Sequence, residues 1–167
     1  MSADVGWSYQ DAVRHAEELL KKSGLPLPKR PAGLAEEYEW PNDVTALTST
    51  QLGQLMGRLS GWQGYSTRLL GMAAIDLHAF ETIYDLLLGR AMGKLSSEKR
   101  QVKEVLKAVS VDSDPILTKL TRALVTKKAA VEALQMQVEI YKQHWLALSR
   151  EQARRADEIK ERSLVGG

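Results

Sequence analysis

The C-terminal part of the chain carries a hydrophobic heptad pattern. Between Leu117 and Leu148, apolar or aromatic side chains recur at alternating steps of three and four residues, with one interruption at Lys127. A seam of this kind needs a partner helix along its whole length. We therefore expect one helix from Pro115 to about Ser163, with the seam buried in helix–helix contacts that lie partly between chains. The predicted oligomerisation residues on this seam are Leu117, Leu120, Leu124, Val131, Leu134, Val138, Tyr141, Trp145 and Leu148.

A second long helix is predicted to begin near residue 48. Thr48 and Gln51 have the spacing of a capping box, while Leu47 and Leu52 have that of a hydrophobic staple. A broad apolar stripe of helical period then continues to about Arg90. The last helix alone would be roughly 70 Å long, whereas a compact chain of this size has a radius of gyration of about 15 Å. The predicted fold is therefore all-α, an elongated antiparallel helical hairpin or coiled-coil bundle.

Glycine is unusually frequent in the first of these two long helices. Five glycines fall between residues 53 and 71, and each costs on the order of 1 kcal/mol relative to alanine inside a helix. Three of them, Gly53, Gly57 and Gly61, recur every four residues and so share one face. This spacing permits close approach of another helix backbone. We predict that these three glycines take part in oligomerisation; the alternative is a helix that is simply bent.

The N-terminal segment predicts one short helix and an extended arm. The short helix runs from Ser8 to Gly24 and is followed by a proline-rich linker over residues 25–31, which cannot continue a helix. An acidic arm with Tyr and Trp side chains then reaches Pro41. We expect this arm either to dock through its aromatic side chains or to lie as a strap on its own domain.

The connection between the long helices predicts a third, shorter helix. Gly89 and Gly93 mark the end of the preceding helix, Ser96 and Ser97 can cap the next one, and Asp114 is a good N-cap for the last. No strand pattern and no internal repeat is present in the sequence. The predicted domains are a short helix with an extended acidic, proline-rich arm over residues 1–46, a helical oligomerisation bundle over residues 47–163, and a flexible tail over residues 164–167.

The composition narrows the class of protein. A chain of 167 residues with 44% hydrophobic content can bury a core. It contains no cysteine, which removes disulfides, thiol catalysis and thiolate metal sites. The first ten residues have neither the basic region nor the apolar run of a signal peptide, and no apolar run approaches the length of a membrane span. We expect a soluble, unsecreted protein.

Charge is distributed unevenly, although the net formal charge is only +2. Residues 91–128 contain nine Lys and Arg against four Asp and Glu, whereas residues 1–50 contain five against eight. If the last two helices fold back on one another, the cations line one end of a hairpin and form a track for a phosphate backbone. The alternative is a pair of solvated helix faces, or contacts with neighbouring subunits. The predicted nucleic-acid-binding residues are Lys94, Lys99, Arg100, Lys103, Lys107, Lys119, Arg122, Lys127 and Lys128.

No arrangement of residues predicts catalysis. The three histidines are far apart in the sequence, and none has a second ligand at the spacing of a known metal motif. Asp76, Glu81 and Asp85 lie on one predicted helix, where a solvated face is the simpler interpretation. A phosphate-binding glycine loop and a nucleophile elbow are both absent from the sequence. We therefore expect no enzymatic activity, no cofactor and no metal site.

Four features follow one another along most of the chain. They are a long helix with Trp and Tyr over residues 52–88, a lysine-rich crossing over residues 94–107, a turn at residues 112–114 and an aromatic-centred last helix over residues 117–155. This layout resembles the UvsY-type recombination mediators of tailed phages. The segment from Leu47-Thr48 to Gln51-Leu52-Gly53 is also similar to the start of the first long helix in small helical proteins of actinobacterial phages. The resemblance covers about residues 47–155.

The resemblance implies a ring-like helical homo-oligomer of phage origin that binds single-stranded DNA in the host cytoplasm and helps to load a recombinase. The acidic, proline-rich arm before Asp43 departs from the pattern of that family. A second interpretation therefore stays open, namely a non-enzymatic structural or assembly protein such as a virion, scaffold or adaptor component. In that case the arm contacts a neighbour and the cations pair with acidic subunits. The expected partners are further copies of the chain, single-stranded DNA, and a recombinase or another phage protein, with no membrane.

Overall fold

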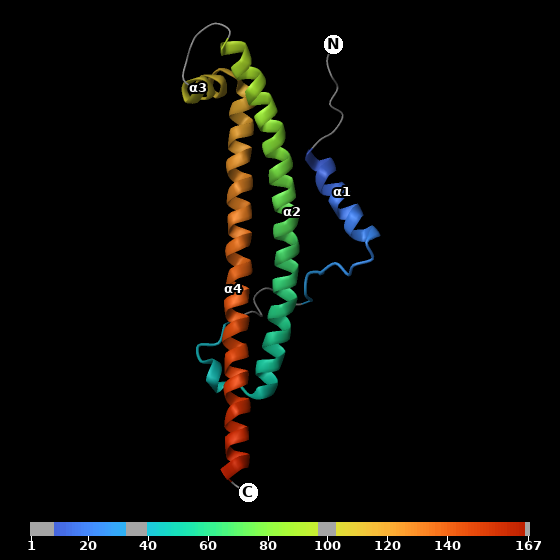
Figure 1. Ribbon diagram of the computed structural model, residues 1–167, viewed down its shortest axis with the longest axis vertical. Helices are drawn as coiled ribbons and strands as arrows, with labels where there is room; N and C mark the ends of the chain where they lie inside the picture. The colour runs from blue at the N-terminus through green and yellow to red at the C-terminus, as the bar shows by residue number, and fades with distance from the viewer. Residues whose placement is uncertain (1–8, 33–39, 97–102, 166–167) are drawn as a thin grey trace. The chain divides into compact units, whose positions relative to one another are not determined.

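The structure, a computed structural model, describes residues 9–32, 40–96 and 103–165. Within these residues it is all-α and contains no strand, which confirms the predicted fold class (Figure 1). The two long helices pack against each other. The elements are α1 (Tyr9–Lys22), the short 3-10 helix η2 (Val44–Ala46), α2 (Ser49–Ser96), α3 (Lys103–Ser113) and α4 (Pro115–Val165).

Both long helices begin where their sequences contain capping residues. The backbone N–H of Thr48 donates to Gln51 Oε1 at 2.8 Å, and the backbone N–H of Gln51 donates to Thr48 Oγ1 at 3.3 Å. These reciprocal bonds are the predicted capping box, and they satisfy two of the donors that a helix start leaves open. At the start of α4, Asp114 Oδ1 accepts the backbone N–H of Ile116 at 2.8 Å. Side-chain chemistry close in sequence therefore fixes both starting points.

The predicted end of the first long helix was wrong. We expected α2 to end near Arg90, but it continues to Ser96 through Gly89 and Gly93. Neither glycine has a positive φ, so each keeps the helical conformation at a cost of about 1 kcal/mol relative to alanine. Gly24 behaves differently, because its φ of +69° is the left-handed conformation that ends α1. The helix continues through Gly89 and Gly93 because neighbouring side chains of α2, Leu88 and Met92 among them, pack in the core of unit 1.

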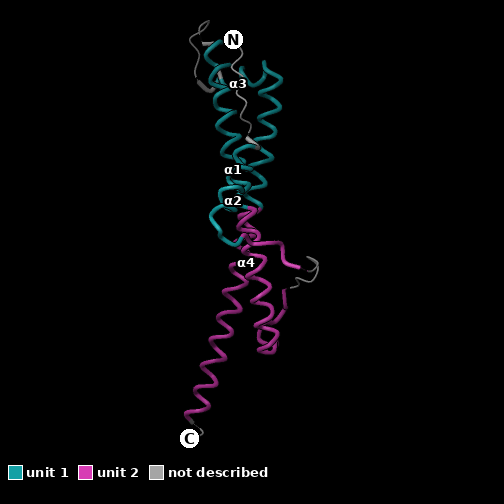
Figure 2. The backbone as a smooth tube through the Cα atoms, turned by 90° about the vertical axis from the view of Figure 1, so that its right-hand side faces the viewer, with its two compact units in different colours: residues 1–26, 70–133 teal, residues 27–69, 134–167 magenta. Residues whose placement is uncertain are grey.

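The chain divides into two compact units, each built from two separate segments (Figure 2). Unit 1 consists of Met1–Pro26 and Leu70–Ala133, and unit 2 consists of Leu27–Leu69 and Leu134–Gly167. Each unit therefore contains part of α2 and part of α4. The predicted domain boundary at residue 47 lies just before the start of α2. The units instead divide in the linker after Pro26, within α2 after Leu69 and within α4 after Ala133.

The core of unit 2 joins the two long helices to the segment that precedes α2. Leu52, Leu59 and Leu148 are buried, and partly buried side chains from all three segments pack around them. These surrounding side chains are Trp40, Val44, Leu47, Leu55, Met56, Tyr141 and Trp145. The heptad seam of α4 therefore finds its partner helix within the same chain.

The core of unit 1 is formed by α2 and α4 together with α3. Tyr84 and Leu88 of α2 are buried against Leu117 of α4, and Val111 of α3 packs beside them. The hydroxyl of Tyr84 lies 3.1 Å from Thr121 Oγ1, which satisfies its polar end inside the helix contact. In this unit, too, the seam of α4 packs against α2. Burial of part of the seam in contacts between chains stays a prediction.

Candidate nucleic-acid interface

Four of the predicted DNA-binding cations have exposed side chains in unit 1. Lys94 lies in the last turn of α2, Lys107 in the middle of α3, and Lys119 and Arg122 in the first turns of α4. The sequence between Leu117 and Val131 contains no acidic residue. Each of α2, α3 and α4 thus contributes at least one exposed cation to unit 1.

Three other predicted cations fall partly or wholly outside the described structure. Lys99 and Arg100 belong to the segment 97–102, which lies outside the described residues. Lys103 begins α3, but its side chain is outside the described structure as well. The sequence-based prediction for these three residues is unchanged.

Lys127 and Lys128 point to carboxylates of α2. Lys127 Nζ forms an ion pair with Asp76 and lies 5.3 Å from the centroid of the Phe80 ring. Lys128 Nζ lies 2.9 Å from Glu81 Oε1, and the hydrogen bond to that carboxylate raises the pKa of Lys128. Each of these cations already faces an anion, so each offers a polyanion less net charge than an unpaired Lys would. We therefore leave Lys127 and Lys128 out of the candidate interface, which then has fewer residues than the nine predicted.

These ion pairs also correct the interpretation of the carboxylates on α2. We expected Asp76, Glu81 and Asp85 to form a solvated face, but two of the three are paired with α4. Among the described residues, no group of three or more His, Asp and Glu side chains is arranged to hold a metal ion. The interruption of the seam at Lys127 was the signal that an acidic partner lay on the facing helix.

Sequence reasoning missed Arg90, which belongs to the same region. Its side chain is exposed and stands one helical turn before Lys94 on α2, so the two cations share a face. The sequence indicates Arg90 through its spacing of four from Lys94. We call Arg90, Lys94, Lys107, Lys119 and Arg122 the cationic set.

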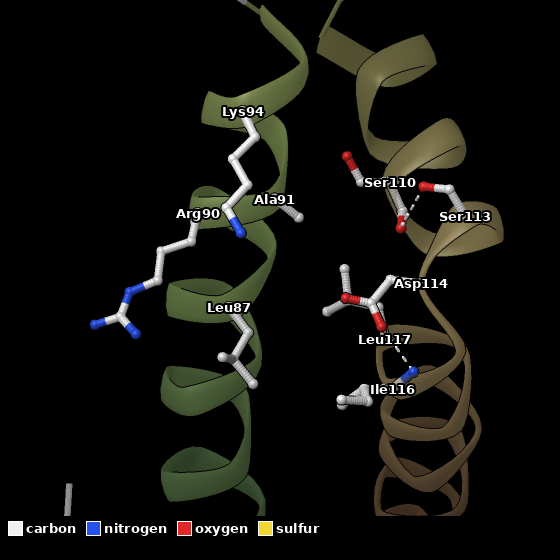
Figure 3. Close-up of a pocket in the computed structure, with 9 residues that line it drawn as sticks. All are labelled: Leu87, Arg90, Ala91, Lys94, Ser110, Ser113, Asp114, Ile116 and Leu117. Atoms are coloured by element: carbon white, nitrogen blue, oxygen red, sulfur yellow. Dashed lines mark hydrogen bonds between the residues drawn. The ribbon is translucent and has the colours of Figure 1, made fainter. Parts of the chain in front are cut away.

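A cavity of about 420 Å³ lies among α2, α3 and α4 beside two members of the cationic set. Figure 3 shows that Ala91 projects toward α3 and α4, while the guanidinium of Arg90 extends away from them. The residues lining the cavity are Leu87, Arg90, Ala91 and Lys94 of α2, Ser110 and Ser113 of α3, Asp114, and Ile116 and Leu117 of α4. The cavity therefore combines apolar walls with cations and hydroxyl groups.

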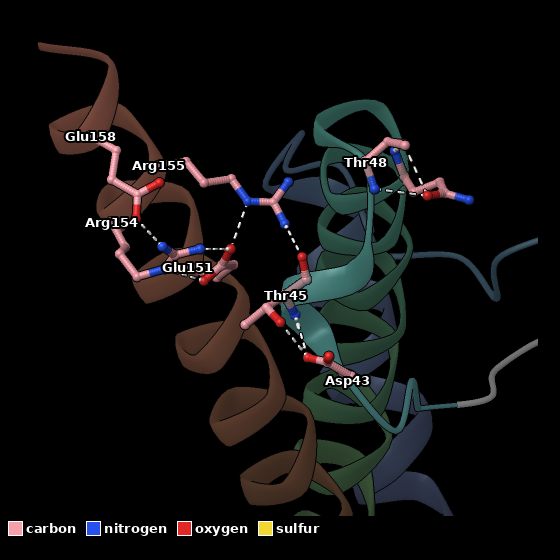
Figure 4. A network of polar contacts seen from close by, with 8 residues as sticks. Asp43, Thr45, Thr48, Glu151, Arg154, Arg155 and Glu158 are labelled. Atoms are coloured by element: carbon pink, nitrogen blue, oxygen red, sulfur yellow. Dashed lines mark hydrogen bonds and ion pairs between the residues drawn. The ribbon is translucent and has the colours of Figure 1, made fainter. Parts of the chain in front are cut away.

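Unit 2 contains a network of polar contacts around a buried carboxylate (Figure 4). Glu151 is buried, and it accepts hydrogen bonds from Arg154 Nε at 2.8 Å and from Arg155 Nε at 2.6 Å. Arg155 also donates to the backbone carbonyl of Thr45 at 3.1 Å. Asp43 accepts the backbone N–H of Thr45 at 2.8 Å. The network thus ties η2 to α4.

The hydrogen bonds from Arg154 and Arg155 lower the pKa of Glu151 to about 2 from an ordinary value of 4.5. A carboxylate with a lowered pKa in the folded state stabilises the fold above its ordinary pKa, and this stabilisation is lost as the pH falls toward the lowered value. We therefore expect Glu151→Gln to reduce the decrease in Tm between pH 5 and pH 3. Glu161→Gln, which changes an exposed residue of the same helix, is the control. An unchanged decrease in both variants would contradict the role assigned to Glu151.

The described end of the arm packs on its own chain. The ring of Trp40 stacks on His144 of α4 with centroids 3.8 Å apart and an interplanar angle of 18°. Trp40 also packs against the buried cluster of unit 2. Of the two expectations for the arm, the strap on its own domain holds for Trp40–Leu47, while residues 33–39 lie outside the described structure.

The predicted glycine face divides into an open part and an occupied part. A Cβ atom at Gly53 or Gly57 would have no neighbour within 4 Å, whereas one at Gly61 would lie 3.4 Å from Pro31 Cγ. Gly64 similarly faces Pro28, whose carbonyl accepts a hydrogen bond from Arg68 at 3.3 Å. At Gly61, therefore, the neighbouring group is the ring of Pro31 in the proline-rich linker of the same chain, which corrects the expectation of a second helix there.

No helix among the described residues is both long enough and apolar enough to cross a membrane. Comparison of the chain with protein-family models, with curated proteins and with solved structures finds no match.

Proposed function

We propose that this chain is a non-catalytic helical protein that binds the phosphate backbone of single-stranded DNA through the cationic set of unit 1. The observation that carries the proposal is the exposure of the five cations on α2, α3 and α4. The described part of residues 86–126 contains three acidic residues, namely Glu104 at the start of α3, Asp112 and Asp114. The side chain of Asp114 caps α4. Phosphate contacts of this kind give affinity without sequence preference.

The test is the salt dependence of binding to an oligo-dT strand. Each phosphate contact to a single strand contributes about −0.7 to the slope of log K against log salt. We expect the triple variant Lys107→Gln, Lys119→Gln, Arg122→Gln to bind more weakly and to have a slope smaller by about 2. Fluorescence anisotropy at several salt concentrations measures both quantities.

A matched control separates local contacts from overall charge. Arg150→Gln, Lys160→Gln, Arg162→Gln removes the same three charges from exposed positions of α4 in unit 2. The proposal expects this control to keep a slope close to that of the unchanged chain. If the unchanged chain shows no binding at about 50 mM salt, where screening is weak, the DNA-binding proposal is wrong.

The role as a recombination mediator rests on the resemblance in helix layout together with the proposed DNA binding. It expects the chain to assemble with copies of itself and to speed the loading of a recombinase onto single-stranded DNA. A recombinase filament assay with and without the protein tests this step. The charge-neutralised triple variant is its internal control, because it should fold and assemble but not accelerate loading.

A structural or assembly protein is the second candidate, and exposed apolar side chains favour it. Leu86 and Val125 in unit 1 are 60% and 64% exposed, and Met136 in unit 2 is 64% exposed. An apolar groove also lies along α2 in unit 1, lined in part by Ile75 and Leu86. Single exposed apolar side chains are common on protein surfaces, whereas a continuous apolar groove of this kind is typical of a surface that binds another protein.

The open glycines offer a direct test of assembly. Replacing Gly53 and Gly57 by Leu raises helix propensity but fills the space through which another backbone would approach. If that face is an interface between chains, we expect the particle mass from light scattering to fall while the helix content is kept. Gly89→Leu with Gly93→Leu is the control, because these exposed glycines have the same spacing on the same helix and also face open space. Equal masses for both pairs would exclude an interface at Gly53 and Gly57.

A further inference from the structure

The cavity among α2, α3 and α4 has two walls of different origin. Leu87 and Ala91 of α2 form one wall, and Ile116 and Leu117 of α4 form the other. Leu117 is only 1% exposed and belongs to the core of unit 1, so its position is fixed by packing. Ile116 is 64% exposed and can contact a ligand without any core movement. Both walls therefore offer apolar surface to a ligand.

The polar groups of the cavity are arranged unevenly. Lys94 has an exposed side chain and lines the cavity at α2. The hydroxyl of Ser113 on α3 donates to the carbonyl of Val109 at 2.6 Å, so its oxygen keeps a lone pair that can accept a hydrogen bond. The carboxylate of Asp114 repels an anion. A phosphate therefore belongs on the Lys94 side, and a neutral donor such as a base N–H belongs near Ser113.

The volume agrees with this chemistry. About 420 Å³ lies in the lower part of the range of roughly 300–1,000 Å³ that is usual for small-molecule sites. A bare phosphate would leave the apolar walls without contacts, whereas a base with its sugar covers them. We infer that this cavity receives one unstacked nucleotide, with the base between Ala91 and Ile116 and the phosphate on Lys94. The inference rests on the proposed DNA binding and adds a base contact to it.

The experiment separates the base from the phosphates. Oligo-dT and an abasic strand of the same length carry the same number of phosphates but differ in their bases. We expect the unchanged chain to bind oligo-dT about tenfold more tightly than the abasic strand, because the base buries apolar surface against Leu87, Ala91 and Ile116. Ala91→Leu, which fills the cavity, should bring this ratio close to one while the affinity for the abasic strand stays the same.

Ile116→Ala is a second variant that does not depend on repacking. It removes the exposed wall and should also lower the ratio, whereas Val125→Ala should leave the ratio unchanged. Val125 is the matched control because it is 64% exposed on the same helix, as Ile116 is, but does not line the cavity. Circular dichroism and Tm confirm that each variant is folded.

The outcomes separate the nucleotide cavity from the proposed binding of the phosphate backbone. Equal binding of oligo-dT and the abasic strand would overturn the nucleotide cavity and leave the phosphate-binding function in place. No binding of either strand would overturn both. Free thymidine 5′-monophosphate distinguishes the source of the nucleotide. If it binds the unchanged chain but not Ala91→Leu, and the strands show no base dependence, the cavity takes free nucleotides and its assignment to a DNA strand is wrong.

Discussion

Leu148→Ala should lower the free energy of unfolding by about 2–5 kcal/mol. Leu148 is 0% exposed and is one of three fully or nearly buried side chains in the core of unit 2, with Leu52 and Leu59 of α2. Truncation removes buried methyl groups and leaves a cavity that the helix backbones cannot close completely. Urea denaturation followed by circular dichroism measures the difference.

Met136→Ala is the control for this prediction. Met136 lies on the same helix and is 64% exposed, so its truncation should change the free energy of unfolding by less than about 0.5 kcal/mol. If the two variants were equally stable, the packing of the α4 seam against α2 would be wrong. A loss of stability at Met136 as large as that at Leu148 would instead show that Met136 is covered by another chain.

Lys127→Leu should destabilise the chain by about 1–3 kcal/mol, although it completes the heptad seam. The side chains of Lys127 and Asp76 are only 22% and 25% exposed, so the substitution leaves a largely covered carboxylate without its ammonium. An apolar Leu also loses the favourable position of the cation over the Phe80 ring. Urea denaturation of the single variant gives the loss directly.

A double variant shows whether the pair or the packing is responsible. Replacing Lys127 and Asp76 together by Leu removes both charges and should recover most of the lost stability, because apolar replacements of covered ion pairs are often neutral or stabilising. Lys128→Leu is the control, since its pair with Glu81 is more exposed, at 51% and 36%, and is therefore expected to contribute less to stability than the pair of Lys127. A single Lys127→Leu variant more stable than the unchanged chain would contradict this explanation of the interruption.

The ion pairs of Lys127 and Lys128 also decide which cations can serve the proposed function. A cation that must leave a carboxylate before it meets a phosphate gains little from the exchange. The DNA-binding proposal therefore leaves out Lys127 and Lys128, whose ammonium groups pair with Asp76 and Glu81 of α2. Adding Lys128→Gln to the triple variant should change the salt slope less than any of the three substitutions within it.

Local features of the sequence were sufficient for the fold class and for several element boundaries. The capping box at Thr48 and Gln51 and the N-cap at Asp114 depend on side chains within three residues of the backbone groups they bind, so their chemistry is written in adjacent positions. The heptad spacing from Leu117 to Leu148 likewise gives the face of α4 that becomes buried. Local sequence was not sufficient for the end of α2, because a glycine remains helical where neighbouring helices support it.

Side-chain patterns along the chain therefore establish which residues form helices and which face of each helix is apolar. The partner of each apolar face depends on tertiary contacts. The seam pairs with α2 of the same chain, Lys127 finds Asp76, and Pro31 lies against Gly61. Glu151 is buried, and its carboxylate accepts hydrogen bonds from Arg154 and Arg155. The physical reason is that periodicity defines directions about the axis of one helix, whereas a partner is chosen by packing between segments that are far apart in the sequence.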